Sequence, residues 1–249
     1  MNSVRFIFVL TAMFAASCAS AGSSAVRPSD APRKMVWAWE RPEDLRFLDP
    51  AEYGVAFLAQ SLTLSSDEVE VKLRRQPLRT APEAFVVAVT RIESVRGAAR
   101  PALSETQARR TADLVLKTLE LPNVKGIQVD FDALESERLF YTQLLRQIRA
   151  QLPAGKGLTM TALASWCTGD GWLGDLPVDE AVPMIFEMGT DAAEIRKFLG
   201  SGRDLQEPLC RQSYGVSVDE RNNFPAAEGR RIYFFSSRAW RESDLTRLR

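Results

Sequence analysis

The stretch KGIQVDFD, residues 125–132, decides the fold. Apolar and polar side chains alternate along it, which is the pattern of a β-strand with two different faces. In a barrel of parallel strands surrounded by helices, the apolar face packs against the helices and the other face points into the barrel. The inward face would carry Gln128, Asp130 and Asp132, with Asp132 at the carboxyl-terminal rim of the barrel.

Seven other short apolar runs accompany this stretch and alternate with helical patterns. The eight predicted strands span residues 35–39, 53–59, 84–92, 125–132, 157–164, 181–187, 213–218 and 231–236. Ser104 and Gln107 form a capping box at the start of one amphipathic helix, and a second apolar stripe at helical spacing follows Glu135. Shorter helices are expected at 191–199 and from Ser243 onward. This alternation predicts parallel βα units.

We therefore expect one α/β domain, a compact (β/α)8 TIM-like barrel over residues 35–249. Alternating charges and apolar residues at 68–73 predict a small β-hairpin inserted after the second strand. An open doubly wound sheet is the alternative fold. No glycine-rich phosphate loop follows the first strand, which weakens that alternative as a nucleotide-binding fold.

The amino terminus predicts export. Arg5 is followed by the apolar run 6–16 and then by small residues, the pattern of a secretory signal peptide over residues 1–21. Cys18 stands where a lipoprotein signal places its acylated cysteine, whereas Ala19-Ser20-Ala21 offers signal peptidase a competing site, so both outcomes stay open. Residues 22–34 would form a polar linker. The expected location is the periplasm, either free or anchored to the membrane through a lipidated Cys18.

Composition excludes several kinds of chemistry and partner. The chain has no histidine, which excludes serine–histidine and cysteine–histidine catalysis and removes the most common zinc ligand. Acidic and basic residues number 32 each, so no nucleic-acid partner is expected. We expect no metal and no cofactor. Cys167 and Cys210 could pair in an oxidising compartment, although the predicted strands place one after a strand end and the other before a strand start, and the pairing stays open.

Two carboxylates on one inward face form the central candidate site. Asp130 and Asp132 would repel each other and raise each other's pKa inside the barrel. Such an arrangement costs free energy without an evident structural return, which favours a functional role.

Further charged residues end neighbouring strands at the same rim. Across residues 184–187, Met and Phe alternate with Ile and Glu, which places Glu187 at the rim of the sixth strand. Glu187 either belongs to the site or forms a buried ion pair with Arg91, which ends the third strand. Asp219 ends the seventh strand on its inward side. Acidic residues after a strand also cap helices, which is the role expected for Glu220 and Asp191.

Tryptophans at strand ends suggest a surface for sugar rings, on which flat aromatic faces stack. Trp39 and Trp166 are the two candidates. The parity of the first strand is open, because either Trp37 and Trp39 or Ala38 and Glu40 could face inward. The predicted substrate-binding residues are Trp39, Glu40, Arg91, Gln128, Trp166 and Asp219.

The fourth and sixth strands resemble those of chitinase-like glycoside hydrolases, which read D-G-x-D-x-D-x-E and M-x-Y-D. The matching stretches here are residues 125–132 and 184–187. The resemblance implies a proton donor at Asp132, where the family has Glu, and an orienting partner at Asp130. Gln128 stands where the family has Asp, and Phe186 replaces its Tyr, so the resemblance does not extend to the groups that hold an N-acetyl sugar.

Longer motifs resemble a family of exported bacterial proteins of unknown function. They are VWAWERPEDL, the QVDFDA strand, SWCTGDGWL with LPVDEAVPM, and GVSVDE, and together they extend over nearly the entire mature chain. This second resemblance implies no activity, so function has to be inferred from the site.

The expected function is that of a glycoside-hydrolase-like barrel acting on an extracytoplasmic polysaccharide or oligosaccharide. Asp132 would be the general acid, with Asp130 and Glu187 as base, nucleophile or acid-orienting group. One alternative is a non-catalytic carbohydrate-binding envelope lipoprotein with a degenerate barrel site. Another is a scaffold in an envelope assembly.

Overall fold

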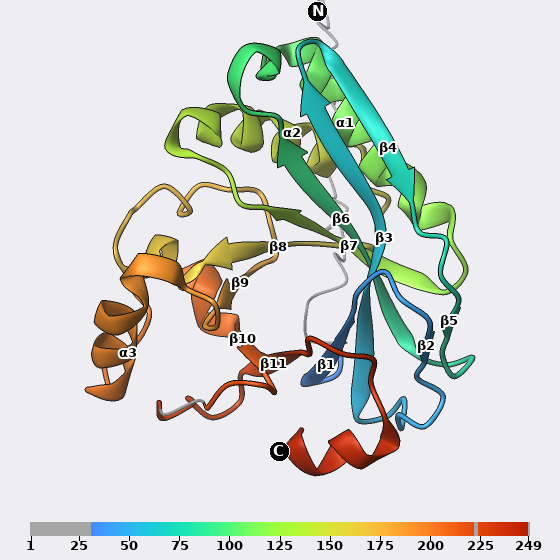
Figure 1. Ribbon diagram of the computed structural model, residues 1–249, viewed down its shortest axis with the longest axis vertical. Coiled ribbons are helices and arrows are strands. Elements are labelled where there is room, and N and C mark those ends of the chain that lie inside the picture. The colour runs from blue at the N-terminus through green and yellow to red at the C-terminus, as the bar shows by residue number, and fades with distance from the viewer. Residues whose placement is uncertain (1–30, 222–223, 249) are drawn as a thin grey trace, which may run out of the picture.

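Eight parallel strands close into a barrel in the computed structural model, which describes residues 31–221 and 224–248. The strands pair in chain order and the last pairs with the first, so the protein is a single-domain TIM-like α/β barrel (Figure 1). They are β1 (Lys34–Ala38), β3 (Tyr53–Ser65), β6 (Phe85–Ser94), β7 (Val124–Phe131), β8 (Gly157–Leu163), β9 (Glu180–Met184), β10 (Ser213–Ser217) and β11 (Arg231–Phe235). The predicted barrel is confirmed, and each predicted strand overlaps an observed one.

The predicted hairpin is present and lies at the edge of the barrel. Strand β4 (Glu68–Leu73) pairs antiparallel with the long β3, and it takes the place of a helix between β3 and β6 (Figure 1). Two short strands, β2 (Glu43–Asp44) and β5 (Leu78–Arg79), pair with each other beside it.

The described residues form three α-helices outside the barrel: α1 (Glu105–Lys117), α2 (Arg138–Gln151) and α3 (Ala192–Gly200). Ser104 caps α1, because its Oγ accepts a hydrogen bond from the Gln107 N–H at 3.2 Å. The helix expected from Ser243 onward is instead a 3-10 turn at Glu242–Arg247. No helix among the described residues is long and apolar enough to cross a membrane.

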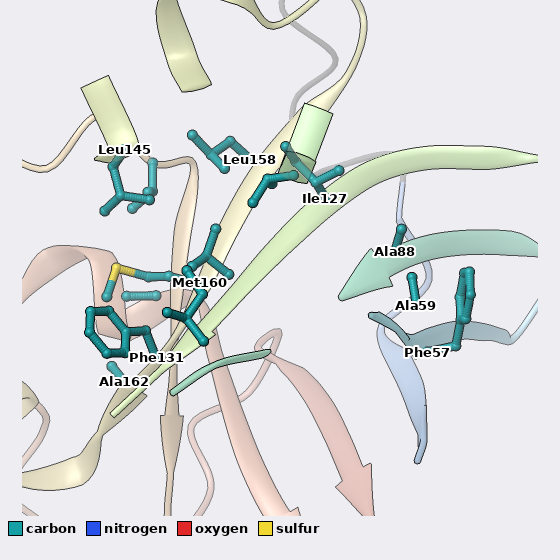
Figure 2. Packing of buried hydrophobic residues seen from close by; sticks show 14 of the residues in the cluster. Phe57, Ala59, Ala88, Ile127, Phe131, Leu145, Leu158, Met160 and Ala162 are labelled. Atoms are coloured by element: carbon teal, nitrogen blue, oxygen red, sulfur yellow. The ribbon is translucent and has the colours of Figure 1, made fainter. Parts of the chain in front are cut away.

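Apolar side chains pack on both sides of the barrel wall. Outside, Ile127 and Phe131 of β7 pack with Met160 of β8 and Leu145 of α2 (Figure 2). Inside, a second cluster joins strands from opposite sides of the barrel: Met35, Trp37, Ala56, Val87, Val89, Val182, Tyr233 and Phe235. Burial of each large apolar side chain stabilises the fold by about 1.5–3 kcal/mol. Since Trp37 faces inward, Trp39 shares its face, and Ala38 and Glu40 do not.

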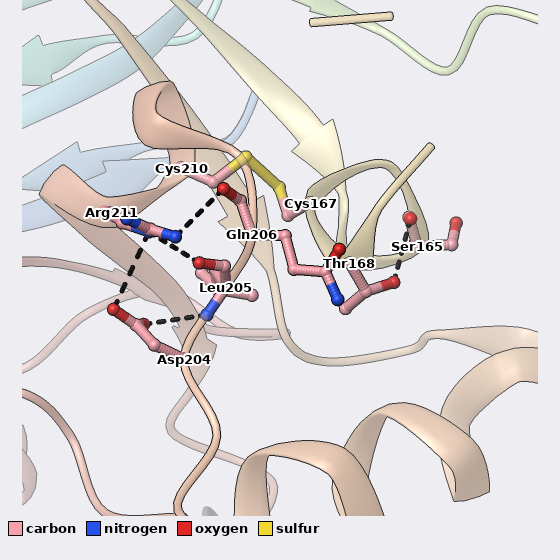
Figure 3. The surroundings of a disulfide bond; sticks show 8 residues. All are labelled: Ser165, Cys167, Thr168, Asp204, Leu205, Gln206, Cys210 and Arg211. Atoms are coloured by element: carbon pink, nitrogen blue, oxygen red, sulfur yellow. Dashed lines mark hydrogen bonds and ion pairs between the residues drawn. A yellow bond between two sulfur atoms is a disulfide. The ribbon is translucent and has the colours of Figure 1, made fainter. Parts of the chain in front are cut away.

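A disulfide joins Cys167 and Cys210, whose Cα atoms lie 5.9 Å apart (Figure 3). The predicted strand positions argued against a disulfide between these cysteines, and in this respect they were wrong. No α-helix links β8 to β9; the chain forms a 3-10 turn at Ala164–Thr168, which contacts β9, as does the turn Pro208–Gln212 that precedes β10. Both cysteines therefore flank β9 on the outside. A disulfide of this kind is consistent with an extracytoplasmic protein.

Candidate functional site

A cavity of about 300 Å³ opens at the carboxyl-terminal mouth of the barrel. Its wall comes from the ends of the four consecutive strands β6 to β9, from the end of β1, from the loop after β9 and from α3. The lining residues are Trp39, Arg91, Asp130, Asp132, Leu163, Ala164, Ser165, Met184, Phe186, Glu187, Met188, Gly189, Asp191 and Ile195. The cavity thus contains the three predicted catalytic carboxylates, together with Arg91 and Trp39.

Asp130 is buried in the wall of the cavity and held from two sides. Its Oδ1 accepts a hydrogen bond from Thr161 Oγ1 at 2.7 Å, and its Oδ2 accepts one from Arg91 Nη1 at 3.0 Å. Burial raises the pKa of Asp130, and the neighbouring Arg91 opposes that rise, while the charge of Asp132 adds to it. The carboxylate is therefore fixed in orientation and costly to ionise.

Asp132 lies further out, at the rim. Its side chain is 46% exposed, and its Oδ2 is 3.7 Å from Arg91 Nη2. Arg91 also donates from Nε to Glu93 at 3.0 Å. The guanidinium is thus shared among three carboxylates, none of which is Glu187. The predicted alternative of a buried Glu187–Arg91 pair is wrong.

The position of Glu187 at the cavity does not follow from the alternation of side chains along β9. Strand β9 ends at Met184, and beyond it Ile185 packs in the outer core while Phe186 packs inside. Glu187 then turns the chain with φ at +47°, a conformation that residues other than glycine seldom adopt. This turn directs the chain away from the strand, and Glu187 lines the cavity.

Two residues brace this turn. The Glu187 N–H donates to Glu220 Oε1 at 3.0 Å, and Arg196 of α3 donates to Glu220 Oε2 at 3.0 Å. The helix-capping role predicted for Glu220 is therefore wrong. Asp191 does precede α3, but its side chain makes no cap hydrogen bond; it lines the cavity instead.

Aromatic rings form the inner floor of the cavity. Trp37 stacks on Phe235 with ring centroids 4.6 Å apart, and Phe186 packs on Phe235 at the same distance. The ring centroids of Trp39 and Trp37 lie 5.5 Å apart. Trp39 and Phe186 line the cavity directly, so part of its surface is apolar and flat.

No protein-family model matches the chain, and no curated protein sequence matches it. The chain bears a distant structural resemblance to the spore cortex-lytic enzyme SleL of Bacillus cereus. The TM-score is 0.47 and the identity 17%, over 76% of this chain and 51% of that one. The chain thus spans about half the length of SleL.

Two predicted substrate-binding residues lie outside the cavity on other parts of the surface. Glu40 Oε1 accepts a hydrogen bond from the Arg75 N–H at 3.2 Å, and its Oε2 lies 3.6 Å from Lys72 on β4. Asp219 Oδ2 accepts a hydrogen bond from the Ser237 N–H at 2.8 Å, which lowers the pKa of Asp219. Both carboxylates hold loops together rather than face the mouth.

Two other predicted residues are buried. Trp166 is 4% exposed and packs edge-on against Trp172 in the outer core, because the 3-10 turn after β8 folds outward. A stacking role for Trp166 is not compatible with this position. Gln128 is fully buried inside the barrel beneath Asp130, and its amide has no hydrogen-bond partner among the described protein atoms. Cys18 lies outside the described residues.

Sequence reasoning missed the contribution of the loop after β9. Met188 and Gly189 of this loop and Ile195 of α3 line the cavity, although nothing in their sequence pattern signals a site. The described residues include no group of three or more His, Cys, Asp or Glu placed to hold a metal ion. The lining of the cavity offers carboxylates, one guanidinium and aromatic side chains.

Proposed function

We propose that the protein is a glycoside-hydrolase-like barrel that acts on an extracytoplasmic polysaccharide. The observation that supports this proposal most is the arrangement of the mouth: carboxylates from β7 and from the loop after β9 flank one cavity with an aromatic floor. Sugar hydrolysis needs two carboxyl groups on either side of the scissile bond and a flat apolar surface for the ring.

In this proposal Asp132 is the general acid. It gives its proton to the glycosidic oxygen as the bond to the anomeric carbon breaks. Glu187, on the other side of the cavity, either accepts a proton from the attacking water or attacks the anomeric carbon itself. Asp130, fixed by Thr161 and Arg91, orients the acid and contributes negative charge beside the developing oxocarbenium ion.

The second candidate function is carbohydrate binding without turnover. Arg91 lies next to both Asp130 and Asp132, so both carboxyl groups already have a charged partner at the mouth of the barrel. In this case the aromatic floor would hold a glycan, and the carboxylates would bind its hydroxyl groups.

The substitution Asp132→Asn separates the two functions. We expect it to lower turnover of the hydrolysed polysaccharide by about 10²–10⁴-fold, as measured by release of reducing ends. Asp113→Asn on the exposed face of α1 is the matched control, and it should leave turnover unchanged. Turnover that survives Asp132→Asn would disprove the assignment of the acid. Glycan binding by the wild type with no turnover on any polysaccharide would favour the binding function.

Export remains part of the proposal. The disulfide between Cys167 and Cys210 supports an oxidising compartment. Anchoring through a lipidated Cys18 would keep the protein at the membrane. Mass spectrometry of the mature protein would distinguish an acylated Cys18 from an amino terminus beyond residue 21.

A further inference from the structure

The mouth cavity carries an excess of negative charge. Of the residues that the structure describes, four carboxylates line it, those of Asp130, Asp132, Glu187 and Asp191, against one cation, Arg91. Two further carboxylates are bound to arginines beside it, Glu93 to Arg91 and Glu220 to Arg196. Arg91 is already shared among Asp130, Asp132 and Glu93, and it has no contact with Glu187 or Asp191.

Glu187 and Asp191 are the carboxylates available to a ligand. Neither forms an ion pair with a Lys or Arg in the part of the chain that the structure describes. Both are exposed and both face the cavity from the loop after β9. They come from the loop after β9, whereas Arg91 and the aspartates that it contacts come from β6 and the end of β7.

The aromatic lining favours the same kind of ligand. Trp39 and Phe186 border the cavity, and the faces of aromatic rings attract cations, tryptophan most strongly. A ligand that combines a flat apolar face with an ammonium group could pack on these rings and pair with the carboxylates at the same time. A neutral sugar would leave Glu187 and Asp191 uncompensated, and an acidic sugar would be repelled.

We infer that the site takes polysaccharides that carry free amino groups, such as polymers of hexosamine without N-acetyl groups. This inference rests on the proposed carbohydrate function and specifies its substrate class. The ammonium group would bind Glu187 and Asp191, while the sugar ring packs on Trp39.

Three oligosaccharides of equal length test the inference by isothermal titration calorimetry of the full mature protein. They are the hexamers of glucosamine, of N-acetylglucosamine and of β-1,4-linked glucose. At low salt and slightly acidic pH we expect the glucosamine hexamer to bind about tenfold more tightly than the other two, with the difference shrinking as salt screens the charges.

Two variants locate the effect. The double substitution Glu187→Gln and Asp191→Asn should remove most of the preference for the glucosamine hexamer over the glucose hexamer, measured as the ratio of the two affinities. Glu194→Gln is the matched control, because Glu194 is an exposed carboxylate of α3 that does not line the cavity. It should leave the preference intact. A preference that survives the double substitution would overturn the inference.

The outcomes separate this inference from the proposed function. Equal or tighter binding of a neutral hexamer would overturn the amino-sugar assignment and leave the carbohydrate function standing. Absence of binding for all three hexamers would overturn both.

Discussion

Strand β9 connects two carboxylate sites of opposite character at the two ends of the barrel. At its start, Glu180 is 1% exposed and pairs with Arg231 at 2.5 Å, and Arg231 also donates to the Pro32 carbonyl at 2.9 Å. The adjoining cavity is only about 30 Å³. Beyond its end, Glu187 is exposed and lines a cavity ten times larger, about 300 Å³, without an ion-pair partner among the described residues.

This difference shows that charge inside a barrel does not by itself indicate function. The Glu180–Arg231 pair closes the amino-terminal end, and its charges compensate each other where water has little access. At the mouth the carboxylates outnumber the cations and water can enter. Only the second arrangement leaves groups free to bind a ligand.

Removal of the arginine at each end should give the largest difference. Arg231→Met leaves Glu180 buried without its cation, and we expect a loss of about 3–5 kcal/mol in the free energy of unfolding. Arg91→Met should cost less, about 1–2 kcal/mol, because Asp132 and Glu93 are exposed to water and Asp130 keeps its hydrogen bond from Thr161. Urea unfolding at pH 8 measures both. Equal losses would contradict the distinction between a sealed end and an open one.

Adding Glu180→Gln to the Arg231→Met variant checks the cause. If the loss comes from an uncompensated carboxylate, neutralising Glu180 should restore part of the stability. If the second substitution restores nothing, the loss reflects packing of the arginine side chain instead.

The disulfide lies outside the barrel beside β9, between the two carboxylate sites. Replacing Cys167 and Cys210 with Ala should lower the free energy of unfolding by about 2–4 kcal/mol, since the bridge closes a loop of 43 residues in the unfolded chain. Ligand affinity at the mouth should change little, because neither cysteine lines the cavity. If affinity fell by as much free energy as stability, the shape of the mouth would depend on the segments that the disulfide joins.

The pH dependence of stability should be the smallest effect. Burial raises the pKa of both Asp130 and Glu180 above their ordinary values near 4. Between those ordinary values and the raised pKa, the folded state holds protons that the unfolded state has lost, so stability falls as pH rises. Each group contributes at most about 1.4 kcal/mol per pH unit in that range.

Asp130→Asn and Glu180→Gln should each flatten this slope, as measured by urea unfolding from pH 4 to pH 8. Asp113→Asn is the control and should leave the slope unchanged. A stability that rises with pH through this range would mean that Arg91 and Arg231 outweigh burial at the two ends.

Local sequence patterns were sufficient to predict the fold and the part of the site that comes from β7. The alternation in residues 125–132 identified the inward face of β7, and residues 68–73 were predicted as the hairpin that the structure shows. The part that comes from the loop after β9 could not be predicted in the same way. Glu187 follows the end of its strand, and its direction depends on a positive φ that Glu220 and Arg196 stabilise from distant positions in the chain.

The sequence by itself determined the barrel, the parity of β7 and the presence of Asp130 and Asp132 at one rim, because side-chain periodicity is a local property of the backbone. The tertiary structure alone decided that Arg91 pairs with those aspartates, that Trp166 is core, and that Cys167 meets Cys210. These outcomes depend on how the connections that lack helices fold back over the barrel. The periodicity of side chains along the sequence does not predict the path of such connections.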